Sequence, residues 1–247
     1  MKQIALIFTA LVIFGAQAVA QTPAKTDSSN KKKDWSKVKI SNRANDHFML
    51  QLGYDGWAPL PDTIRTKGLS HSINVYVMLD FPFKTDPRFS VGLGAGIGSS
   101  NMKFDNQEPN VIALSNTLPF KRTDSSRFKS FKLVTTYVEA PIELRFVADP
   151  ENSDRSWKAA VGLKVGALLN VHTRGKTLLN AAGNTINNFT QKESSKNFFG
   201  GTRLVGTARV GYGHISLFGQ YSVTNLLKDG RGPALHPYSI GITLSGL

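Results

Sequence analysis

The chain has 247 residues, a formal net charge of +13 and no cysteine. Without cysteine it contains neither a disulfide framework nor a catalytic thiol, and a lipidated N-terminal cysteine is excluded. After residue 20 no apolar run approaches the roughly 18–20 residues of a membrane-spanning helix, and the length suits one domain of moderate size.

The N-terminus has the pattern of a secretory signal peptide. Lys2 is followed by the apolar run Ile4–Phe14 and by small residues at Ala18 and Ala20. We therefore expect residues 1–20 to be removed and the mature protein to be exported. Residues 21–45 are rich in lysine and predict a solvated, basic periplasmic tail, with binding to anionic lipid as the alternative. No nucleic-acid partner is expected, because an exported chain rarely meets one.

Residues 46–247 are predicted to form one domain of eight strands. The stretch Thr136–Phe146 is the clearest example: Val138, Ile142 and Leu144 alternate with charged side chains, which gives one apolar and one polar face. The eight segments with this period are His47–Trp57, Ser70–Phe83, Arg88–Phe104, Ser130–Val147, Ser156–Val171, Phe198–Tyr212, His214–Thr224 and Tyr238–Ser245.

Long and short connections alternate along these segments. Asp105–Lys129 and His172–Asn197 are predicted to be long loops, whereas Lys84–Pro87, Ala148–Arg155 and Gly211–Gly213 are short. Short turns at one end and longer loops at the other are typical of outer-membrane barrels. The predicted fold is an all-β, eight-stranded, antiparallel up-and-down transmembrane β-barrel, located in the bacterial outer membrane.

The two faces of the strands favour this interpretation over a soluble barrel. The apolar faces carry no charge near their centres and have aromatic residues near their ends. A soluble barrel would turn its charges to water, whereas a membrane barrel encloses them in the lumen, where they must be paired. The predicted lumen ion-pair candidates, with a structural role, are Asp80, Glu139, Glu143, Arg145, Lys164, Arg203 and Arg209.

Two residue types on the polar faces predict local features of the barrel. The interior of an eight-stranded barrel is nearly filled by side chains, so alternating glycines such as those in Gly92–Gly98 are expected to make room for large neighbours. Pro141 has no N–H for the strand ladder and predicts a bulge or a local break.

Several stretches resemble a known family. Tyr137–Leu144 resembles the Y-x-E-x-P-x-x-L strand of the PorT-like outer-membrane β-barrel proteins, widespread in Bacteroidetes, and Ala160–Gly166, Gly201–Tyr221 and Tyr238–Ile242 are similar to later strands of that family. The resemblance implies an integral outer-membrane barrel. Because some relatives belong to the type IX secretion apparatus, it also implies a possible subunit of an envelope or secretion assembly.

No catalytic, cofactor or metal residues are expected from the sequence. The five histidines are scattered without ligand spacing, and the strand glycines do not form a phosphate-binding loop. We expect a non-enzymatic structural or interaction protein whose partners are outer-membrane lipids, with another envelope or secretion protein as a further candidate partner. Two alternatives remain: a narrow porin-like channel for small polar solutes, and a lipid A-modifying enzyme that would use His71 with Ser70 or Ser72.

Overall fold

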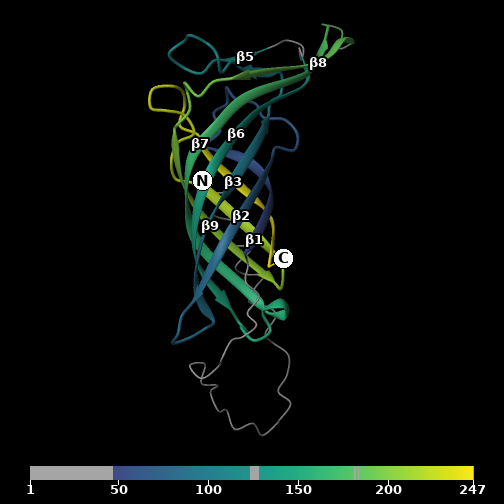
Figure 1. The fold of residues 1–247 in the computed structure, drawn as a ribbon. Coiled ribbons are helices and arrows are strands. Elements are labelled where there is room, and N and C mark those ends of the chain that lie inside the picture. Colours follow the sequence, from purple (N-terminus) through teal and green to yellow (C-terminus); the bar gives the residue numbers. More distant parts are fainter. Residues whose placement is uncertain (1–46, 123–127, 181, 183, 247) are drawn as a thin grey trace. The chain divides into compact units, whose positions relative to one another are not determined.

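The computed structural model describes residues 47–122, 128–180, 182 and 184–246, so the predicted signal peptide and the whole of the predicted basic tail lie outside the described residues. Eight strands form a closed ring in which all neighbours are antiparallel, and the pairing of β6 with β7 closes it (Figure 1). This confirms the predicted fold class. The ring consists of β1 (Phe48–Ala58), β2 (His71–Pro82), β3 (Phe89–Lys103), β6 (Phe128–Val147), β7 (Trp157–Leu179), β9 (Thr202–Tyr212), β10 (Ile215–Ser222) and β11 (His236–Ser245).

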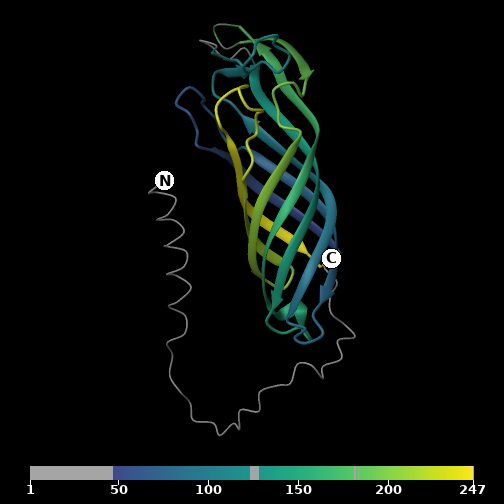
Figure 2. The same ribbon diagram turned by 90° about the vertical axis from the view of Figure 1, so that its left-hand side faces the viewer.

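The two ends of the ring differ, as the alternation of connections predicts. The connections β2–β3, β6–β7 and β9–β10 are short and lie at one end, which we call the turn end; the second contains the 3-10 turn Ser153–Arg155. The longer connections lie at the other end, which we call the loop end (Figures 1 and 2).

The structure corrects the two connections predicted to be long loops. Within Asp105–Lys129, β4 (Gln107–Pro109) pairs with β5 (Phe120–Arg122). Within His172–Asn197, β7 continues to Leu179, and β8 (Thr185–Ser194) pairs with this extension. The prediction was wrong because the outward face of β7 becomes polar there, which hides a strand from a search for apolar alternation.

Other strand ends differ from the prediction by a few residues. β9 begins at Thr202 instead of Phe198, β10 ends at Ser222, and β11 begins at His236. In the part of the chain that the structure describes, no helix is long and apolar enough to cross a membrane.

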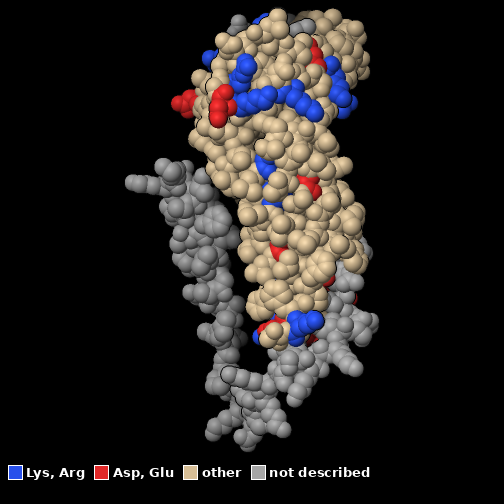
Figure 3. Space-filling view, turned by 60° about the vertical axis from the view of Figure 1, so that its left-hand side comes forward, with Lys and Arg blue, Asp and Glu red and all other residues tan. Residues whose placement is uncertain are grey.

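The apolar faces of the ring strands point outward. Leu217 is 61% exposed and Trp157 63% exposed, and the aliphatic outward residues of the other ring strands show comparable exposure. Trp157 packs edge-on against Tyr212 at the turn end, whereas Tyr54 and Tyr221 are exposed towards the loop end. Figure 3 shows the resulting wall, on which Lys, Arg, Asp and Glu are rare between the two ends.

The irregularity predicted at Pro141 is a break without a bulge. Pairing between β3 and β6 stops at Leu93 and resumes at Gly96 in the same register, so the interruption lies opposite Pro141. A bulge lies elsewhere, in the pairing of β6 with β7. There Leu169 of β7 is one extra residue opposite the junction of Thr136 and Tyr137 of β6. An extra residue reverses which side chains face inward. Beyond the bulge Val171 is therefore fully buried, although the alternation of β7 up to that point would have placed it outside.

Candidate functional site

The lumen near the turn end contains a cluster of ion pairs. Glu143 Oε2 accepts hydrogen bonds from Arg145 Nε at 3.0 Å and from Arg209 Nη2 at 3.1 Å. Arg145 also reaches Asp80, with 3.5 Å between Nη1 and Oδ1, and Ser90 donates to the same Asp80 oxygen at 2.7 Å. Only 1% of Glu143 is exposed, so these charges compensate one another in a site with little access to water.

A second cluster, centred on Glu139, lies nearer the loop end. Its Oε1 accepts from Arg203 Nε at 2.8 Å, and its Oε2 accepts from the Tyr76 hydroxyl at 2.5 Å. The Arg203 guanidinium carbon also lies 3.9 Å from the centroid of the Tyr137 ring, a cation–π contact. Three strands, β2, β6 and β9, thus contribute to one desolvated charge site.

Lys164 is held differently from the other predicted lumen charges. Its Nζ donates to Gln220 Oε1 at 2.8 Å, to Gln51 Oε1 at 3.0 Å and to the Tyr76 hydroxyl at 3.1 Å, and within the described residues it forms no ion pair. The expectation that every lumen base pairs with an acid does not hold here. The reason is geometric, because Arg203 and Tyr76 already occupy the carboxylate of Glu139.

The structure brings the seven predicted residues together in the lumen, since the side chain of each is at least mostly buried. Two glycines show how the interior accommodates them. A Cβ atom on Gly92 would lie 2.5 Å from Arg145 Nε, and one on Gly98 would lie 2.8 Å from Glu139 Oε2. A side chain at Gly92 or Gly98 would therefore clash with the charged neighbour unless that neighbour moved.

Towards the loop end the interior becomes apolar, which the sequence reasoning missed. Inward residues of the strands pack there against residues of the long connections. This group, which we call the apolar plug, consists of Trp57, Ile64, Met102, Phe104, Val111, Leu118, Leu133, Tyr137, Leu168, Val171, Phe198, Phe199, Leu226, Leu227 and Leu235. Apolar residues in the connections, such as Val111 and Leu235, were the available signal.

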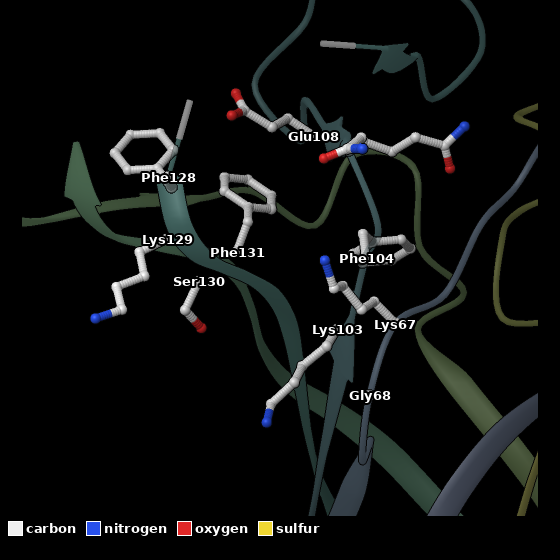
Figure 4. A pocket seen from close by; sticks show the side chains of 11 residues that line it. Lys67, Gly68, Lys103, Phe104, Glu108, Phe128, Lys129, Ser130 and Phe131 are labelled. Atoms are coloured by element: carbon white, nitrogen blue, oxygen red, sulfur yellow. The ribbon is translucent and has the colours of Figure 1, made fainter. Parts of the chain in front are cut away.

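A pocket of about 250 Å³ opens beside the plug at the loop end (Figure 4). Phe104, Phe128 and Phe131 form part of its lining. Lys103, at the end of β3, and Lys67, in the β1–β2 connection, line it as well. Lys67 pairs with Asp105 at 3.1 Å. The pocket combines aromatic surface with the lysines Lys67, Lys103 and Lys129 and one carboxylate, Glu108, so basic side chains outnumber acidic ones in its lining.

The comparisons with known proteins agree with this architecture. The family model described as "Outer membrane protein beta-barrel domain" matches residues 28–227. The protein belongs to the outer-membrane β-barrel family. No curated protein matches the chain.

Membership of the family locates the barrel in the outer membrane and gives its two faces their meaning. The exposed aliphatic wall is the lipid-facing surface, and the charged clusters lie inside the lumen. The prediction that the apolar strand faces meet lipid is confirmed together with the localisation.

The residues considered for lipid-modifying chemistry do not contact one another as that chemistry requires. Ser70 Oγ accepts from the backbone N–H of Lys103 at 3.1 Å, and Ser72 Oγ bonds to Ser239 Oγ at 3.0 Å inside the lumen. His71 Nδ1 lies 3.4 Å from the Leu69 carbonyl. Among the described residues, no group of three His, Asp or Glu side chains is arranged to hold a metal ion.

Proposed function

We propose that this outer-membrane barrel is a closed structural or interaction component of the cell envelope, and neither an enzyme nor a diffusion pore. The observation that carries the proposal is the filling of the interior. The two charged clusters and Lys164 occupy the lumen between the lipid-facing walls, and the apolar plug covers it towards the loop end. Eight strands leave an interior that such side chains can fill.

The surface left for interaction is the loop end. Buried apolar residues of the long connections pack in the plug against residues of the strands, and this packing holds the connections at the loop end of the ring. β8 pairs with β7 and ends the sheet order, and among the described residues no strand pairs with its other edge. On this strand Ile186 is 61% exposed and Phe189 39% exposed. Free strand edges and exposed apolar residues are typical docking features.

The partner that we propose is another envelope or secretion protein. The Y-x-E-x-P-x-x-L pattern at Tyr137–Leu144 supports a PorT-like barrel and hence a place in such an assembly. In the structure this pattern has a structural use, because Tyr137 and Glu139 both contact Arg203.

The test is affinity purification of the tagged chain from cross-linked native outer membranes, followed by mass spectrometry. Reproducible recovery of one envelope protein is expected. Ile186→Asp should remove that protein if β8 is the docking edge. Leu114→Asp is the matched control, because Leu114 is fully exposed on a different connection. Recovery of the barrel alone, at native abundance, would contradict the proposal.

The channel alternative draws on the polar lumen and is tested separately. The closed interior predicts no conductance from the purified barrel in planar bilayers. Regular conductance steps that change in Arg209→Gln would favour a narrow pore. For the enzyme alternative, the masses of lipid A from cells with and without the protein are compared, and identical masses are expected.

The orientation is tested by protease on intact cells. Cleavage is expected within 105–129 or 172–197, because these connections lie at the loop end. Cleavage confined to the short turns would place the loop end in the periplasm and contradict the topology.

A further inference from the structure

Four basic side chains lie directly opposite one another across four neighbouring strands. The strand register pairs Lys103 of β3 with Lys132 of β6, Lys132 with Arg174 of β7, and Arg174 with Lys192 of β8. We call these four residues the cationic row. Because neighbouring strands are about 4.8 Å apart, the row extends over about 14 Å.

The row points to the outside of the barrel. On β6, Lys132 alternates with Leu133, which belongs to the apolar plug inside the barrel, and shares its face with the lipid-exposed Val138; Val134, between them on that face, is buried. The bulge at Leu169 brings Arg174 onto the same outer face as Lys132. Figure 3 shows Lys and Arg side chains gathered near the loop end, with Asp or Glu side chains beside them, beyond the wall on which charged residues are rare.

The row lies at the border of the lipid-facing wall. The outward positions of β3 change from Ile97, which is exposed, through Ser99 and Asn101 to Lys103. At the same height the interior changes from charged to apolar, as Leu133 in the plug illustrates. At this height the outward face becomes polar and the inward face becomes apolar, which marks where the strand leaves the hydrocarbon region of the membrane. The row therefore lies at the level of the lipid headgroups.

Carboxylates do not compensate the row within the described part of the chain. None of its four members forms an ion pair there, and the nearby Asp105 is engaged by Lys67. Lys132 donates to Asn101 Oδ1 at 2.6 Å and lies within the electrostatic reach of Lys103 and Arg174. Like charges directly opposite one another destabilise a sheet, so an external anion would stabilise this one.

We infer that the cationic row binds the phosphates of an outer-leaflet lipid whose headgroup carries two or more of them. A line of cations matches a headgroup with several phosphates, and Arg174 offers the planar fork that binds phosphate in a bidentate manner. A lipid is favoured over a soluble anion because the row is continuous with the wall that contacts the acyl chains. The pocket beside Lys103 and Lys67 gives further headgroup atoms a place to bind.

The test compares two double variants of the full mature barrel in nanodiscs. Lys132→Gln/Arg174→Gln removes the centre of the row. Lys84→Gln/Arg155→Gln removes the same charge from exposed positions at the turn end. Binding of bis-phosphorylated lipid A, of its dephosphorylated form and of inorganic phosphate is measured by native mass spectrometry. The gel shift of the unheated barrel verifies that each variant is folded.

We expect the wild type and the turn-end variant to retain the phosphorylated lipid. The row variant should bind it roughly 25-fold more weakly, since each basic residue near an anionic surface contributes roughly a factor of five. Equal binding by the two folded variants would overturn the inference, as would equal binding of the dephosphorylated lipid. Retention of inorganic phosphate equal to that of the phosphorylated lipid would show that the row binds a free anion. A dimer that is lost only in the row variant would show that the row contacts a second copy of the chain. Either result overturns the lipid assignment.

Discussion

Replacing Glu143 by Gln tests whether the ion pairs of the lumen hold the barrel together. The substitution keeps the shape of the side chain but removes the charge that Arg145 and Arg209 share at 3.0 and 3.1 Å. Both guanidinium groups are buried, and a guanidinium stays charged. Each would therefore lose the carboxylate of Glu143 as a partner while its charge remains shielded from water. Removing one partner of a buried pair typically costs about 3–5 kcal/mol. Because Arg145 keeps its contact with Asp80, we expect about 3 kcal/mol, the lower end of that range.

The assay is urea unfolding of the barrel in phospholipid vesicles, followed by tryptophan fluorescence and by the gel shift of the folded form. Glu151→Gln is the matched control, because Glu151 lies exposed in the short β6–β7 connection, where an ion pair contributes at most about 1 kcal/mol. In a double-mutant cycle, Arg209→Gln should cost less in the Glu143→Gln background than in the wild type. If Glu143→Gln and Glu151→Gln lower the free energy of unfolding equally, the lumen is hydrated and the reasoning fails.

Two further predictions concern a glycine in the lumen and a surface ion pair. Gly92→Ala should lower the free energy of unfolding by about 1–3 kcal/mol, because the added Cβ displaces Arg145, whereas Gly219→Ala, whose Cβ would meet nothing within 4 Å, should leave the urea midpoint nearly unchanged. Equal midpoints for the two variants would contradict the close packing of the lumen. At the turn end, hydrogen bonds from Arg88 lower the pKa of Asp86 below its ordinary value of 3.8. Since the pKa of Asp86 is lower in the folded state than in the unfolded state, the Asp86–Arg88 pair contributes fully to stability above the ordinary pKa, and this contribution is lost as the pH falls through the folded-state pKa. Asp86→Asn should remove this acid-dependent loss from the pH profile of the urea midpoint. A profile identical to that of the wild type would refute the prediction.

Much of the barrel is predictable from the sequence for a simple reason. A strand that crosses lipid must present an apolar side chain at every second position, so a segment such as Val138–Phe146 carries its own evidence of strand type and of orientation. The length of a connection is likewise a local property, and its alternation indicates the two ends. The same alternation assigns Glu143 and Arg209 to the lumen without knowledge of their neighbours.

The sequence does not determine which of these lumen residues meet. Glu143 and Arg209 come from strands that are separated by β7 around the ring, and their contact depends on the closure of β6 on β7 and on the register of three strands. Lys164 illustrates the limit: its charge and its face are predictable, but its three neutral partners follow only from the positions of Glu139 and Arg203 in space.

Beyond the lipid border the sequence by itself was misleading, and the tertiary structure decided the outcome. There the strands exchange their faces, because water replaces lipid outside and the long connections supply apolar cover inside. Beyond the border the apolar side chains of the alternation therefore face inward and the polar ones outward. On β7 the single extra residue Leu169 also shifts which positions face inward. A row such as Lys103 and Lys132 arises only from the register between strands, since residues far apart in the chain become direct neighbours across the sheet.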